Sequence, residues 1–104
     1  MDDIKFQLRY LPLFYEDMAE VVDYISNDLQ NPTAALKLID LTEQAIIKRL
    51  DNPLSFQPTQ SKRERKHPYY RININNYAVF YVVIDDVMEV RRFLYSRRDI
   101  QSII

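Results

Sequence analysis

The chain has 104 residues, enough for a single domain (1–104) with a modest core, and its 47% hydrophobic and 28% charged residues are typical of an ordinary soluble globular domain. It has no cysteine, no glycine and one histidine, which excludes a disulfide framework, disfavours a structural zinc site and removes the glycine-rich loops that approach nucleotide phosphates. We therefore expect no metal and no cofactor. The net charge of −1 hides an asymmetry, because residues 1–61 carry 5 basic and 10 acidic side chains and residues 62–104 carry 9 and 5. This asymmetry favours an anionic partner for the basic half.

The N-terminal segment predicts a strand followed by a helix. Apolar and polar residues alternate from Ile4 to Tyr10, which is the pattern of a half-buried strand, and Pro12 ends it. Apolar residues at helical spacing then run from Phe14 to Leu29, with acidic residues mostly on the opposite side.

A second helix follows at once. Asn31 is a good N-cap and Pro32 is favoured at the first helical position. An apolar stripe continues from Ala35 to Leu50 and stops at Asn52–Pro53. Two helices joined by so short a turn predict an antiparallel helical hairpin.

Residues 53–68 have no usable periodicity. The segment is rich in proline and contains the polar stretch Gln60–His67. It is either a solvated connecting loop or a binding loop that becomes ordered on a partner.

The last third predicts three antiparallel strands over Tyr69–Ile74, Tyr77–Ile84 and Val87–Tyr95. Asn75–Asn76 and Asp85–Asp86 separate them, and these residue types tolerate the left-handed conformation that two-residue hairpin turns need. The middle run is apolar throughout, which favours the central position in the sheet. The expected fold is α+β, with an N-terminal strand and a helical hairpin packed on a curved antiparallel sheet.

Two-residue turns fix which residues share a face of the sheet. The first expected face is nearly all apolar and should lie under the helices: Tyr70, Ile72, Ile74, Tyr77, Val79, Tyr81, Val83, Met88, Val90, Arg92 and Leu94. The second mixes arginine with aromatic residues: Tyr69, Arg71, Asn73, Ala78, Phe80, Val82, Glu89, Arg91, Phe93 and Tyr95.

Three interpretations of the second face stay open. Exposed rings and arginines suit single-stranded RNA, whose bases stack and whose phosphates bind guanidinium groups. The same face suits a peptide, and it is equally consistent with aromatic residues packed under the C-terminal segment. After the last strand, Arg97 and Arg98 could hold a phosphate, unless Asp99 neutralises one of them.

Several short segments, taken together, resemble the RelE/ParE family of bacterial toxins. They cover almost the whole chain: Tyr24–Ile25, Asn31–Ala35, Arg49–Pro53, Tyr70–Arg71, Asn76–Tyr81 and Val90–Asp99. The resemblance implies the same helical hairpin and curved sheet. It also implies a growth-inhibiting toxin of a type II toxin–antitoxin pair, held inactive by a cognate antitoxin in the cytoplasm.

The resemblance leaves two modes of action. RelE-like members cleave mRNA on the ribosome, and for that activity the matching residues are Arg71, Arg98 and Tyr95, the last standing where many relatives have histidine. ParE-like members act on DNA gyrase. Ala78 occupies the place of a phosphate-stabilising arginine of the nucleases, and the tail tyrosine that some of them use is absent, so the balance favours gyrase.

The expected surface for an antitoxin or for RNA comprises Arg71, Asn73, Phe80, Arg91, Phe93, Arg97 and Arg98. A third possibility is a degenerate member that only binds its antitoxin. No apolar run is long enough to span a bilayer and no signal peptide is recognisable, so no membrane is expected among the partners. With no cysteine and one histidine, no metal is expected among them either.

Overall fold

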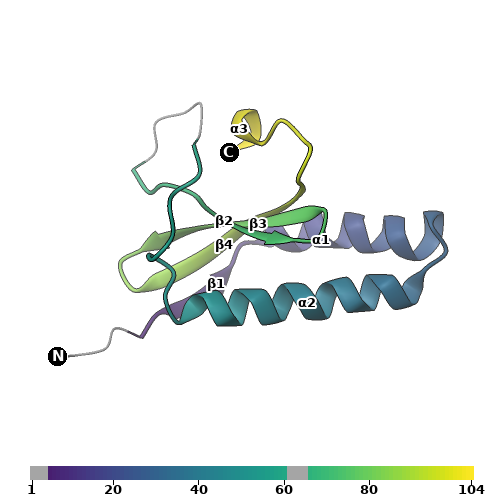
Figure 1. Cartoon of the computed structure of the whole chain (residues 1–104), viewed down its shortest axis with the longest axis horizontal. Helices are drawn as coiled ribbons and strands as arrows, with labels where there is room; N and C mark the ends of the chain where they lie inside the picture. The colour runs from purple at the N-terminus through teal and green to yellow at the C-terminus, as the bar shows by residue number, and fades with distance from the viewer. Residues whose placement is uncertain (1–4, 61–65) are drawn as a thin grey trace.

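The computed structural model of the chain describes residues 5–60 and 66–104, and it confirms the α+β fold. Figure 1 shows the helical hairpin along one face of an open sheet and the C-terminal segment on the other face. The elements are β1 (Gln7–Tyr10), α1 (Pro12–Asp23), η1 (Tyr24–Asp28), α2 (Pro32–Leu50), β2 (Tyr70–Ile74), β3 (Tyr77–Ile84), β4 (Val87–Tyr95) and α3 (Ile100–Ile103). Ile4 of the expected first strand and residues 61–65 of the expected loop lie outside the described residues.

The sheet is mixed, with strand order β1-β4-β3-β2. Strands β2, β3 and β4 form the expected antiparallel meander, with β3 in an internal position. Strand β1 joins the edge of β4 in parallel, and Gln7 pairs with Val87 there. The expectation of a purely antiparallel sheet therefore holds for the meander, and the N-terminal strand adds a parallel pair.

The two-residue hairpin turns are confirmed. Asn75 and Asp85, the first residues of the two turns, have φ angles of 53° and 55°. A left-handed backbone is costly for most residues, and asparagine and aspartate are among those that adopt it most readily. These two side-chain types thus replace glycine in a chain that has none.

The first helix changes its geometry before it ends. After α1 the backbone makes a π-helical turn, η1, in which the Leu29 amide donates to the Tyr24 carbonyl over 3.0 Å. The wider turn shifts the following side chains around the helix axis. Leu29, expected in the apolar stripe, is the C-cap residue of this turn and is 55% exposed.

The second helix agrees with the sequence at both ends. The Asn31 side chain accepts a hydrogen bond from the Ala34 amide over 3.1 Å, and Pro32 occupies the first turn. The helix ends at Leu50, just before the expected stop.

Both faces of the sheet are covered by apolar side chains. The cluster under the helices comprises Phe14, Leu38, Ile46, Tyr70, Ile72, Ile74, Val79, Tyr81, Met88, Val90 and Phe93. A second cluster lies under the C-terminal segment and comprises Tyr69, Ala78, Phe80, Val82, Leu94, Ile100 and Ile104.

A β-bulge in β4 corrects the expected faces. Phe80 pairs with Arg92 but Tyr81 pairs with Val90, so Arg91 is an extra residue in β4. Such an insertion reverses the faces of the residues beyond it. Phe93 therefore joins the cluster under the helices, Leu94 joins the opposite cluster, and Tyr95 pairs with Tyr77 on the helix side. The expected positions of these three side chains were wrong.

Candidate functional site

Arg71 and Asn73 project from β2, the strand at the open edge of the meander. The Arg71 Nε donates to the Asn73 Oδ1 over 2.7 Å, and its guanidinium lies 5.5 Å from the centre of the Phe80 ring. The structure thus brings these three predicted site residues together. Asn73 is exposed and Arg71 is half-buried, so their polar groups can meet a partner at this edge.

Phe80 and Phe93 do not offer their rings to a partner. They are 0% and 1% exposed, Phe80 under the C-terminal segment and Phe93 under the helices. Of the three interpretations of the second face, the structure matches the one in which the aromatic residues are packed under the C-terminal segment. The expectation that these two rings contribute to an RNA or partner surface is wrong, because both rings are buried.

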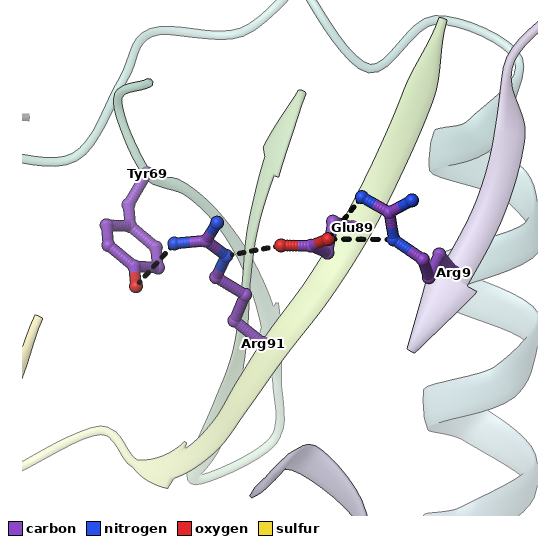
Figure 2. A network of polar contacts seen from close by, with 4 residues as sticks. All are labelled: Arg9, Tyr69, Glu89 and Arg91. Atoms are coloured by element: carbon purple, nitrogen blue, oxygen red, sulfur yellow. Dashed lines mark hydrogen bonds and ion pairs between the residues drawn. The ribbon is translucent and has the colours of Figure 1, made fainter. Parts of the chain in front are cut away.

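Arg91 belongs to a network centred on a buried carboxylate (Figure 2). Glu89 is 5% exposed and accepts hydrogen bonds from the Arg91 Nε over 2.7 Å and from the Arg9 Nε over 2.8 Å. The Arg91 Nη1 also donates to the Tyr69 hydroxyl over 3.4 Å. Two guanidinium groups share one carboxylate, so the network keeps one net positive charge.

The network holds its charges in fixed protonation states. Burial alone raises the pKa of Glu89, but hydrogen bonds from Arg91 and Arg9 outweigh it, and the pKa lies below its usual value. Burial alone lowers the pKa of Arg91, but the contacts with Tyr69 and Glu89 raise it overall. Arg91 is therefore a permanent cation whose Nε and Nη1 are already bound.

The Arg92 guanidinium binds a carboxylate of the first helix, α1. Its Nε and Nη2 donate to the two Asp17 carboxylate oxygens over 2.8 Å and 3.0 Å, and the Phe93 amide donates to Asp17 over 3.0 Å. The hydrogen bond with Asp17 raises the pKa of Arg92 above its usual value. This bidentate pair fastens α1 to β4 next to the bulge.

Arg97 and Arg98 are exposed in the turn after β4. The turn is held by the Ser96 amide, which donates to the Asn76 carbonyl over 2.8 Å, and by the Arg98 amide, which donates to the Tyr95 carbonyl over 3.1 Å. The Asp99 carboxylate accepts a hydrogen bond from the Ser102 hydroxyl over 2.7 Å, at the start of α3. The two guanidinium groups can therefore meet an anionic partner.

Tyr95 lies away from the arginines of the second face. Its ring contacts Tyr77 at 5.7 Å between centroids, on the helix side of the sheet. The structure does not bring it together with Arg71.

Sequence reasoning missed the partners of the arginines. The sequence did place Glu89 and Tyr69 on the same face as Arg91. Glu89 stands between the apolar residues Met88 and Val90, and a carboxylate in such a position indicates a buried ion pair. Nothing in the sequence connects Arg9 to Glu89 before the parallel pairing of β1 with β4 is known.

The described residues contain no grouped metal ligands and no membrane-spanning helix. Among residues 5–60 and 66–104, no three His, Cys, Asp or Glu side chains are grouped so that they could hold a metal ion. No helix in the described part of the chain has the length and apolar character to cross a membrane.

The chain resembles toxin–antitoxin structures over most of its length. The chromosomal ParDE TA system from P. aeruginosa contains a chain with a TM-score of 0.64 and 15% identity, and the match covers 88% of this chain and 96% of that one. The E. coli DinJ-YafQ toxin-antitoxin complex contains one with a TM-score of 0.55 and 9% identity, covering 88% and 93%. At such low identity these likenesses show the fold alone.

No curated protein matches the chain. The model of the ParE toxin of the type II toxin-antitoxin system parDE matches residues 8–100, and the chain therefore belongs to this toxin family.

Proposed function

We propose that this toxin stops growth by acting on DNA gyrase and that a cognate antitoxin holds it inactive in the cytoplasm. The gyrase target follows from the resemblance to ParE-like toxins. The antitoxin is supported by the type II family and by the similar structures, a ParDE system and a DinJ-YafQ toxin-antitoxin complex.

The separation of Arg71 from Tyr95 supports a target other than mRNA. An RNA-cleaving site needs a proton donor and a phosphate-binding cation within a few ångströms of one phosphodiester. Arg71 contacts the Phe80 ring under the C-terminal segment, whereas Tyr95 contacts Tyr77 on the helix side. Ala78, where the nucleases carry an arginine, is fully buried. These positions favour a toxin that works by binding rather than by cleavage.

The test is to express the chain in bacteria and to measure DNA synthesis and protein synthesis separately, with a gyrase supercoiling assay on the purified protein. We expect DNA synthesis to fall first and supercoiling to be inhibited. Arrest of protein synthesis first, with mRNA cut on the ribosome and normal supercoiling, would overturn the gyrase proposal.

The alternative is ribosome-dependent mRNA cleavage. It is favoured by the position of Arg71 on the open edge strand, where its charge lies next to the exposed Asn73. Arg71→Ala separates the two modes, because losing a phosphate contact costs a nuclease several kcal/mol of barrier, roughly 3. We expect this variant to inhibit growth like the parent, with an unchanged thermal midpoint. Loss of inhibition in a normally folded Arg71→Ala chain would favour the nuclease.

The antitoxin is expected to contact both the hairpin and the basic side of the sheet. Between α1 and α2 lies an apolar groove of about 230 Å³, lined by Phe14, Met18, Ile39 and Ile46 among others. Large apolar side chains of an antitoxin suit this groove, and acidic side chains suit Arg97 and Arg98. We propose a segment that becomes ordered as it binds across these surfaces.

A further inference from the structure

A recess lies at the end of the sheet beside the tip of the helical hairpin. It has a volume of about 520 Å³ and is lined by Glu20, Val21, Tyr24, Leu29, Asn76, Tyr77 and Tyr95. Three aromatic rings and one carboxylate thus come together from α1, η1 and the ends of β3 and β4. Of these residues only Tyr95 was a candidate for RNA cleavage, and none belongs to the expected basic surface.

Two of the three rings, those of Tyr77 and Tyr95, are held in place by packing. Tyr77 stacks on the buried Phe93 with centroids 5.2 Å apart, and Tyr95 meets Tyr77 nearly edge-on at 5.7 Å. Tyr24 and Tyr95 keep 49% and 39% of their surface exposed. Burial, followed by the nearby Tyr24 and Tyr95, raises the pKa of Tyr77, as expected where three phenols share one space.

The π-helical turn places Tyr24 at the recess. Wide turns of this kind often occur at functional sites because they change the direction of a side chain. Here η1 begins at Tyr24 and is capped by Leu29, which is exposed and lines the same recess. The irregular turn and the exposed apolar side chains therefore coincide.

The one charged side chain that lines the recess, Glu20, is acidic. Between Arg9 and Lys37 the sequence contains five carboxylates and no lysine, arginine or histidine. Asp17 is paired with Arg92, whereas Glu20 is exposed at the recess and interacts with Arg92 only through longer-range electrostatics. Arg97 and Arg98 leave the end of β4 but do not line it. In the part of the chain that is described, the arginines that lie over rings are Arg49, Arg71 and Arg91, on other aromatic residues.

We propose that this recess binds an arginine side chain of a protein partner. The planar guanidinium stacks against the tyrosine rings, and Glu20 accepts hydrogen bonds from it. An acidic, ring-lined hollow attracts a cation and repels nucleic acid phosphates, so the partner is a protein. The proposal does not depend on whether the toxin acts on gyrase or on the ribosome.

The first test uses the full chain labelled with ¹³C in its tyrosine rings and followed by NMR. The probe is N-acetyl-arginine amide, and the control is N-acetyl-citrulline amide, which has nearly the same shape and no charge. We expect arginine to shift the ring signals of Tyr24, Tyr77 and Tyr95 in a saturable way and to bind about fivefold or more tightly than citrulline. Equal binding of the two probes, or no shift of these signals, would overturn the proposal.

The second test compares matched variants. Tyr24→Ala and Glu20→Gln should each weaken binding of the arginine probe by about threefold to tenfold. Tyr15→Ala and Glu16→Gln alter an exposed tyrosine and an exposed carboxylate of the same helix outside the recess, and they should leave the affinity unchanged. If both pairs behave alike, the recess is not the binding site. Glu20→Gln changes only an exposed side chain, so it remains informative even if Tyr24→Ala folds poorly.

Discussion

The buried carboxylate of Glu89 lies between two arginines, and its contribution to the free energy of unfolding depends on pH. Its pKa in the folded chain lies below the unfolded value of about 4.3 because Arg91 and Arg9 donate hydrogen bonds to the charged form. A group with a depressed folded-state pKa stabilises the protein above the unfolded value. That contribution is lost as the pH falls through the folded-state pKa.

Glu89→Gln should therefore lower the free energy of unfolding by about 2 kcal/mol at neutral pH, since charged hydrogen bonds are replaced by weaker ones. The difference from the parent should shrink as the pH falls below about 4. Urea denaturation at a series of pH values measures it. The exposed Glu16→Gln should change stability by less than about 0.5 kcal/mol. A difference that stays constant down to low pH would show that the charge of Glu89 contributes little.

Tyr81 is the most buried polar aromatic side chain of the central strand. It is fully buried, its hydroxyl donates to the Pro53 carbonyl over 2.7 Å, and the Arg49 Nη1 donates to that hydroxyl over 3.0 Å. The ring also stacks on Tyr70 with centroids 5.3 Å apart. One side chain thus joins β3 to the end of α2 and to the segment after it.

Removing the ring should cost far more than removing the hydroxyl. Tyr81→Ala should lower stability by about 3–5 kcal/mol through the lost packing and the cavity left behind. Tyr81→Phe keeps the ring and should cost about 1–2 kcal/mol for the lost hydrogen bonds. Thermal and urea unfolding of both variants provide the comparison. Similar stabilities of the two variants would mean that the hydroxyl, not the ring, dominates.

At the scale of elements, the sequence predicted the parts whose signals are local. The hairpin turns carry Asn75 and Asp85 at left-handed positions, and Asn31 caps α2, so each boundary depends on neighbouring residues. The bulge at Arg91 has no such signal, because two consecutive arginines fit either register. The predicted faces of the site residues Phe93 and Tyr95 both depend on that register, and both were therefore wrong.

Pairings between distant segments could not be predicted either, because no local sequence signal marks them. Strand β1 joins β4 across about 80 residues of sequence, and Asp17 binds Arg92 over a similar separation. The arginines of the site could be listed from the sequence, but the carboxylates that bind them follow only from the tertiary arrangement. Arg71, Arg97 and Arg98 therefore keep their predicted place on the surface, whereas Arg91 and Arg92 have internal partners.

The C-terminal segment is a second packing layer rather than a loose tail. Ile100 and Ile104 are buried over Ala78, Phe80 and Leu94, and Ile103 is only partly buried beside them. Ile104→Ala should therefore lower stability by about 2–3 kcal/mol. The matched Ile103→Ala should cost clearly less, about 1 kcal/mol. Calorimetry on the two variants measures this, and equal effects would argue against the layer.

At the scale of the molecule, acidic and basic side chains are concentrated in different segments of the chain. Residues 10–36, which run from the end of β1 through α1 and η1 into the start of α2, contain only acidic charges. The basic charges left at the surface by internal pairing include Arg97 and Arg98 at the end of β4. A partner that covers both regions needs opposite charges at its two ends. An antitoxin with an acidic segment for the arginines and an arginine for the recess at Tyr24 would meet that requirement.

The association rate of the antitoxin should depend directly on Arg97 and Arg98 at the end of β4. Opposite charges speed encounter, and added salt screens that attraction. Arg97→Glu/Arg98→Glu should therefore slow association by about tenfold at low salt and flatten its salt dependence, measured by stopped-flow mixing with the product of the adjacent gene. Lys37→Glu/Lys48→Glu makes the same change of net charge on exposed residues of α2 and should have a smaller effect. Bound antitoxin should also raise the thermal midpoint of the parent, because it stabilises only the folded state. If both double variants associate as fast as the parent at every salt concentration, the antitoxin docks away from the end of β4.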